Sequence, residues 1–124
     1  PGILEVLQEL VERKISMGIV SNKEEYFTKQ IVTHFFPTIT FIDVIGRNEN
    51  IQKKPDPTGT LIIVNKTNIN LNDWVFIGDK TTDIKTANNA QIDAIWSTWG
   101  YQNDPPQGEL VASVYRPQEL LGFF

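Results

Sequence analysis

Short apolar runs rich in strand-forming residues constrain the fold of this chain more than any other feature. They occupy residues 17–20, 41–45, 74–77 and 94–97. Runs of this kind are typical of strands that are covered on both faces of a parallel sheet. Helical segments separate them, and this alternation predicts an α/β fold with a Rossmann-like, mostly parallel sheet and helices on both faces.

The helices are expected between and around these runs. The expected segments cover residues 3–14, 24–34, 57–66 and 82–89. A last short strand at 112–115 and a helical turn at the end of the chain complete the pattern. The second helix is expected to carry a single stripe, made of Tyr26, Phe27, Gln30, Ile31 and His34.

Composition bounds the function classes. The 124 residues are 40% apolar and 21% charged, which predicts one small globular domain over residues 1–124. The 11 basic side chains against 15 acidic ones, without a Lys/Arg cluster, argue against nucleic acid as a partner. The absence of cysteine excludes disulfides, thiolate zinc sites and thiol nucleophiles, and a cytoplasmic location is expected. No apolar run approaches the roughly 20 residues that cross a bilayer, so no membrane partner is expected.

Polar residues at the strand ends are the candidates for function, because ligands of parallel sheets gather beyond the carboxyl ends of the strands. Ser21 directly follows the first strand and precedes a helix, so its hydroxyl and nearby backbone N–H groups could face an anion. A serine that only caps the helix is the simpler interpretation. Lys54 lies before Pro55 and Pro57, which restrict the backbone and would aim the lysine. A rigid, solvated turn is the alternative for this segment.

Asp79 and Asp83 form the third candidate. Asp79 stands at the end of the third strand, and Asp83 lies in the first turn of the following helix, so both carboxylates can face one spot. Mg²⁺ prefers one or two carboxylates together with waters and phosphate oxygens. The alternative is that the two aspartates only cap the helix and interact with its dipole.

Taken together, these segments resemble the haloacid dehalogenase-like (HAD) hydrolases, in particular their phosphoglycolate phosphatase-like branch. Residues 17–23 look like the second motif of that family, residues 53–57 like the third and residues 78–83 like the fourth. The helix after Gly2 and residues 98–101 are also similar to family patterns. The resemblance covers essentially all of the chain and implies the same fold.

The resemblance also implies a role for each motif residue. Ser21, with the Asn22 amide beside it, would bind the transferring phosphoryl group together with Lys54. Asp79 would ligate Mg²⁺, and Asp83 would support the metal or Lys54, so Lys54 and Asp83 are the expected catalytic residues. The implied activity is Mg²⁺-dependent hydrolysis of a small phosphorylated substrate, with all these residues at one edge of the sheet. Gly-Asp rather than Ser-Asn at the fourth motif favours a metal-dependent phosphatase over a metal-free dehalogenase.

One departure from the family pattern is serious, because no Asp-x-Asp occurs anywhere in the chain. In this family the first of those aspartates is the nucleophile that forms an aspartyl-phosphate, and its strand is the central one of the sheet. The chain is therefore expected to be the C-terminal part of a HAD-like core. It would be competent only when a missing N-terminal segment or a second polypeptide supplies the first motif. The alternative is a catalytically inactive HAD-like remnant that acts as a binding or interaction module.

Overall fold

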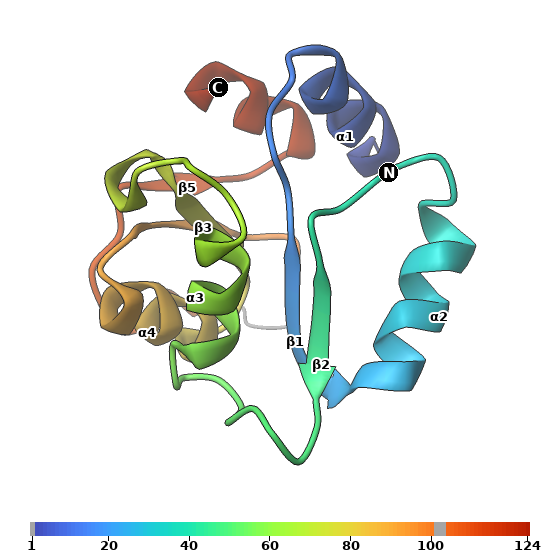
Figure 1. Ribbon diagram of the computed structural model, residues 1–124. Helices are drawn as coiled ribbons and strands as arrows, with labels where there is room; N and C mark the ends of the chain where they lie inside the picture. Colours follow the sequence, from blue (N-terminus) through green and yellow to red (C-terminus); the bar gives the residue numbers. More distant parts are fainter. Residues whose placement is uncertain (1, 101–103) are drawn as a thin grey trace.

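The protein is described by a computed structural model that covers residues 2–100 and 104–124, so the family-like pattern at Tyr101 lies outside the described residues. Within these ranges, helices and strands alternate along the chain (Figure 1). The helices are α1 (Ile3–Glu12), α2 (Glu25–Phe35), α3 (Thr58–Asn65) and α4 (Thr81–Ala90), with 3₁₀ turns η1 (Leu71–Asp73) and η2 (Pro117–Phe123). The strands are β1 (Ile19–Glu24), β2 (Val44–Arg47), β3 (Val75–Gly78), β4 (Asp93–Ser97) and β5 (Ala112–Val114). None of the helices described is long and apolar enough to span a bilayer.

The strands form two parallel sheets. β1 pairs with β2 in one sheet, and β3, β4 and β5 pair in that order in the other. Figure 1 shows the β1–β2 pair in the middle of the molecule, with α2 along one side and the second sheet with α3 and α4 on the other. This arrangement confirms the α/β fold expected from the sequence. Within the part of the chain described, β1 and β3 each keep one edge to which no strand is paired.

β4 lies at the centre of the three-stranded sheet and divides its core in two. Ala94 and Trp96 belong to a cluster with Ile84 and Ala87 of α4. Ile95 belongs to a second cluster, which contains apolar residues of α1, β5 and η2. Because successive side chains of a strand point to opposite faces, these two clusters cover both sides of β4, as its apolar run predicts.

The ends of the first two strands differ from the predicted ones. β1 does not stop before Ser21 but continues to Glu24, because Glu24 still pairs with Arg47 of β2 after a shift in register. β2 begins later than predicted and runs through Gly46, the residue expected to end it. A Cβ at Gly46 would overlap the backbone of Glu25, so the missing side chain lets the start of α2 approach β2 closely.

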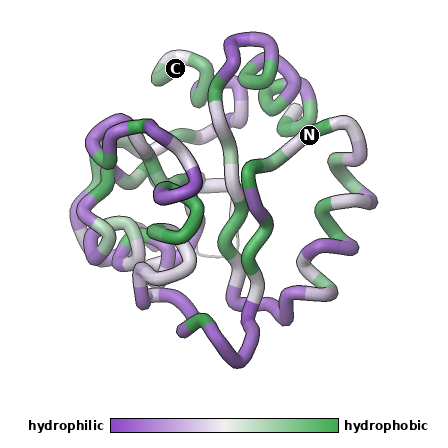
Figure 2. The backbone as a smooth tube through the Cα atoms, viewed as in Figure 1, coloured by the Kyte–Doolittle hydropathy of each residue, from purple (hydrophilic) through white to green (hydrophobic). Residues whose placement is uncertain are grey.

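The stripe expected on the second helix does not form part of the core. In α2, Tyr26, Phe27 and Ile31 are 63%, 56% and 42% exposed, and Thr28 is the buried residue. Figure 2 shows hydrophobic positions along this helix at the outside of the molecule. The physical reason is that α2 packs on the two-stranded β1–β2 sheet, which is too narrow to cover a complete apolar face.

Candidate active site

The loop before α3 carries Lys54 and is attached to the end of β1. The side-chain oxygen of Asn22 accepts a hydrogen bond from the Lys54 backbone N–H at 2.7 Å, and its NH₂ group donates to the Lys54 carbonyl at 3.2 Å. A single asparagine thus satisfies both backbone groups of Lys54 and determines where the lysine side chain starts. The peptide bond between Lys54 and Pro55 is cis.

The Lys54 side chain reaches from this loop to α4. Its Nζ lies 2.5 Å from Oδ1 of Asp83, and the two side chains are only 13% and 8% exposed. The same Nζ lies 5.8 Å from the centroid of the Phe76 ring, whose π face attracts a cation. Solvent and salt screen a buried ion pair weakly. The Lys54–Asp83 pair, together with the contact to Phe76 of β3, therefore firmly connects the lysine loop with α4 and the sheet that contains β3.

Asp83 also holds the turn that carries Asp79. Its Oδ2 accepts hydrogen bonds from the backbone N–H groups of Asp79 at 3.1 Å and of Lys80 at 3.2 Å. These N–H groups lie at the N-terminus of α4, where the helix has no partner for them and where its dipole favours a negative charge. Gly78 permits the arrangement, because a Cβ there would overlap the Asp83 side chain. Asp83 therefore binds Lys54 with one oxygen and the Asp79 turn with the other.

The structure brings four of the five expected site residues together. Hydrogen bonds link Asn22 to Lys54, Lys54 to Asp83, and Asp83 to Asp79. These residues come from the end of β1, the loop before α3, the first turn of α4 and the end of β3. The chain of contacts therefore crosses from one sheet to the other at the carboxyl ends of their strands.

Ser21, the fifth expected site residue, precedes Asn22 in β1. Its hydroxyl oxygen accepts a hydrogen bond from the Lys23 backbone N–H at 3.1 Å. The interpretation of Ser21 as the cap of the second helix is wrong, because Glu24 occupies the cap position of α2 and accepts from the Tyr26 N–H at 2.9 Å. A serine hydroxyl that accepts one hydrogen bond can still donate another to a ligand.

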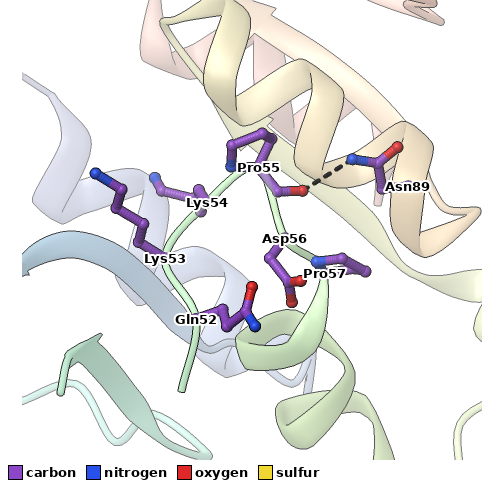
Figure 3. A pocket seen from close by; sticks show the side chains of 7 residues that line it. All are labelled: Gln52, Lys53, Lys54, Pro55, Asp56, Pro57 and Asn89. Atoms are coloured by element: carbon purple, nitrogen blue, oxygen red, sulfur yellow. Dashed lines mark hydrogen bonds between the residues drawn. The ribbon is translucent and has the colours of Figure 1, made fainter. Parts of the chain in front are cut away.

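An open pocket of about 590 Å³ borders the lysine loop. Its lining, drawn in Figure 3, consists of Gln52, Lys53, Lys54, Pro55, Asp56, Pro57 and Asn89. In Figure 3 the side chains of Lys53 and Lys54 extend away from Asn89, which donates a hydrogen bond to the Pro55 carbonyl at 2.9 Å. Because Asn89 belongs to α4, this bond is a second connection between the lysine loop and the helix that carries Asp83.

Two carboxylates have lowered pKa values, one in the lysine loop and one at the opposite, amino end of β2. The Thr58 hydroxyl and backbone N–H both donate to Asp56 and lower its pKa. The same two hydrogen bonds connect the lysine loop with the first residue of α3. Asp43, just before β2, has its pKa lowered chiefly by its hydrogen bond with the Lys66 ammonium, and the Val44 N–H adds to the effect. Both groups are therefore ionised at neutral pH.

The donor set for a metal ion is small. Across residues 2–100 and 104–124, no group of three or more His, Cys, Asp or Glu side chains is placed to hold a metal. Mg²⁺ needs only one or two carboxylates when waters and phosphate oxygens complete its octahedron. Asp79 directly follows β3, and both oxygens of Asp83 accept hydrogen bonds, from Lys54 and from backbone N–H groups. The donor chemistry of these two carboxylates suits Mg²⁺.

Three residues hold this site through contacts that the sequence did not predict, although Gly100 lies in the segment 98–101 that resembles a family pattern. Trp96 of β4 donates its indole N–H to the Asp79 carbonyl at 3.2 Å. The backbone at Gly100 lies against the Asp79 side chain, because a Cβ there would overlap it. Asn89 holds the lysine loop through Pro55. All three act between segments distant in the chain, and no local pattern signals such contacts.

Comparison with known proteins decides the family. The chain matches the family model of the haloacid dehalogenase-like hydrolases over residues 1–97. It belongs to that family. The segments that resemble HAD motifs, at residues 17–23, 53–57 and 78–83, all lie inside the matched part, so the resemblance seen in the sequence is confirmed.

Named relatives of this HAD-like chain are similar over most of its length. The phosphoglycolate phosphatase of Vibrio parahaemolyticus is 29% identical over 106 residues, which cover 86% of this chain and 46% of that protein. The phosphoglycolate phosphatase of Pseudomonas putida is 27% identical over 106 residues, which cover 86% of this chain and 39% of that protein. The chain thus spans less than half the length of these two relatives.

Solved structures confirm the Rossmann-like HAD fold. A candidate phosphoglycolate phosphatase from Lactobacillus delbrueckii subsp. bulgaricus superposes with a TM-score of 0.89 at 30% identity, covering 97% of this chain and 51% of that one. A HAD-superfamily hydrolase from Ehrlichia chaffeensis superposes with a TM-score of 0.81 at 28% identity, covering 98% of this chain and 55% of that one.

Proposed function

We propose that this chain provides the phosphate-binding and metal-binding part of a Mg²⁺-dependent phosphomonoesterase, and that the Asp-x-Asp nucleophile segment lies on sequence outside it. The observation that carries the proposal is the 2.5 Å ion pair between Lys54 and Asp83, because Asp83 also holds the Asp79 turn. The poorly hydrated Lys54 ammonium suits the negative charge of a phosphoryl group. The Asp79 carboxylate, on a turn that Asp83 holds in place, suits a metal ion. Relatives named phosphoglycolate phosphatase support a small phosphorylated substrate.

Each site residue has one task in this proposal. Lys54 neutralises charge on the phosphoryl oxygens, and Asp83 keeps its ammonium in place. Ser21 and the backbone N–H of Asn22 donate to the phosphoryl oxygens, since the Asn22 side chain is already used to hold Lys54. Asp79 holds Mg²⁺, which when bound supplies positive charge to the same oxygens.

The covalent step needs a nucleophile that this chain does not contain, because no Asp-x-Asp occurs in it. In the part of the chain that the structure describes, β1 and β3 each keep an unpaired edge, and such a segment would fit there. A parallel strand inserted between them would end beside Lys54 and Asp79, so an Asp-x-Asp at its carboxyl end would face both the ammonium and the metal ligand.

The first test compares the chain alone with the chain fused to an upstream strand that ends in Asp-x-Asp. The chain alone should not hydrolyse p-nitrophenyl phosphate, since phosphate affinity cannot replace a nucleophile. The fusion should hydrolyse it with Mg²⁺, and Asp79→Ala should abolish the reaction whereas Asp73→Ala, at an exposed aspartate outside the site, should not. Turnover by the chain alone that Asp79→Ala abolishes would overturn the proposal. An inactive fusion would favour the inactive binding module instead.

The second test measures Mg²⁺ binding to the chain alone by calorimetry. One carboxylate from Asp79 leaves the ion mostly hydrated, so we expect a dissociation constant on the order of 1 mM or weaker. The fusion should bind more tightly, because a further carboxylate joins the coordination shell. Binding on the order of 1 μM by the chain alone would show that its ligand set is already complete, and would contradict the proposed assignment.

A further inference from the structure

Trp96 lies in β4 beside the turn that carries Asp79. In the parallel register of β3 and β4, Trp96 is the partner of Gly78, the residue before Asp79. Trp96 is 7% exposed and belongs to the core cluster with Ile84 and Ala87 of α4. The indole ring is therefore held in place by the helix that starts directly after the turn.

Both backbone groups of Asp79 are held from neighbouring elements. The indole N–H of Trp96 donates to the Asp79 carbonyl at 3.2 Å. The Asp79 N–H donates to the Asp83 carboxylate at 3.1 Å. With the backbone of Gly100 against the side chain, contacts from β4, α4 and the segment after β4 limit the direction in which the Asp79 carboxylate can point.

Trp74 offers a contrast within the same core. Its ring packs against the cluster that contains Trp96, yet its buried indole nitrogen has no hydrogen-bond partner among the residues the structure describes. This core therefore accepts a tryptophan ring without using its N–H. The hydrogen bond from Trp96 to the Asp79 carbonyl is therefore not required for packing the ring. Because its donor belongs to a buried residue, this bond restrains the turn.

We propose that Trp96 is a positioning residue of this site, which sets the direction of the Asp79 carboxylate by holding the Asp79 carbonyl. In this role Trp96 acts on the site through the Asp79 carbonyl, the group to which its indole N–H donates. The proposal rests on the proposed function for the role of Asp79 as the magnesium ligand. The restraint on the turn, in contrast, is a property of this chain that can be measured without any metal.

The experiment compares Trp96→Phe with Trp74→Phe. Each variant replaces one indole ring with a phenyl ring and so loses one N–H group. Amide hydrogen exchange is followed by NMR at Asp79, with Ile95 in the middle of β4 as the internal reference. Trp96→Phe should accelerate exchange at Asp79 about fivefold relative to Ile95, the ratio that corresponds to one hydrogen bond of about 1 kcal/mol. Trp74→Phe should leave this ratio unchanged. Equal ratios in the two variants would overturn the proposal.

Mg²⁺ alone is the second probe, added in a titration of the same amide signals. Trp96→Phe should weaken Mg²⁺ binding about fivefold, and Trp74→Phe should not change it. If the unmodified chain binds no Mg²⁺ while the exchange ratio responds as expected, the magnesium assignment fails and the restraint by Trp96 stands. If Mg²⁺ binds equally to both variants, Trp96 does not position the ligand and the proposal is overturned.

A third variant covers the case in which Trp96→Phe does not fold. Benzothienylalanine at position 96 keeps the shape of the bicyclic ring and has a sulfur atom in place of the N–H, so the packing against Ile84 and Ala87 is retained. It should show the same fivefold acceleration at Asp79, because only the donor is lost. Exchange at Asp79 that matches the unmodified chain would refute the role of the hydrogen bond.

Discussion

Replacing Asp83 with asparagine tests the contact on which the site depends. The Lys54 and Asp83 side chains are 13% and 8% exposed, so the variant leaves an ammonium with little solvent and no counter-charge. Removing one partner of a buried ion pair costs about 3–5 kcal/mol. Asparagine still has an oxygen for the N–H groups of Asp79 and Lys80, so we expect a loss at the lower end, about 3 kcal/mol of unfolding free energy.

A double-mutant cycle measured by urea unfolding separates the charge effect from lost packing. Combining Asp83→Asn with Lys54→Met removes the uncompensated ammonium, so the double variant should be more stable than the sum of the single losses by about 2 kcal/mol. Asp43→Asn is the matched control, because its partner Lys66 is 49% exposed and such pairs contribute at most about 1 kcal/mol. A loss of less than about 1 kcal/mol in Asp83→Asn, or strictly additive single effects, would refute the reasoning.

Three further predictions concern other parts of the fold. The pKa of Asp43 is lowered from 3.8 in the folded chain, so its ion pair stabilises the fold above about pH 4 and this contribution is lost as the pH falls below that value; Asp43→Asn should therefore flatten the acid limb of a stability-against-pH curve, and an unchanged limb would contradict it. Gly100→Ala should cost about 1–3 kcal/mol in urea unfolding, because the new methyl group overlaps Asp79, whereas Gly122→Ala has open space and should cost little; equal costs would argue against the close contact. Gln91 ends α4 with φ of 62°, so Gln91→Gly should raise the unfolding free energy by about 1 kcal/mol, and a lower melting temperature would speak against strain at this position.

Elements whose pattern is local were predicted well from the sequence. β4 and α4 lie within a few residues of their expected ranges, because a short apolar run and the helix after Gly78 depend on neighbours along the chain. The boundary of β1 was wrong for the opposite reason. Its extension past Ser21 depends on pairing between Glu24 and Arg47, which are brought together only when β2 lies alongside.

The burial of apolar side chains also depended on tertiary contacts that a local pattern does not specify. The stripe on α2 has helical spacing, but spacing indicates which residues share a side and not whether anything covers that side. Phe27 and Ile31 remain exposed because, among the residues described, the sheet beneath the helix consists of β1 and β2 alone. Ile77, in a run that reads as a buried strand, is 37% exposed because β3 is the edge of its sheet.

For the site, the sequence by itself determined which residue types are present and in which order: a serine and asparagine after an apolar run, a lysine before two prolines, and two aspartates at the start of a helix. Those choices are local, since they require only a strand end, a stiff loop and a helix N-terminus. The tertiary structure decided that Asp83 binds Lys54, and that Trp96 and Gly100 lie against Asp79. Such contacts depend on the packing of elements far apart in the chain, where differences of about 1 Å decide whether a hydrogen bond exists, and no sequence spacing specifies a distance of that kind.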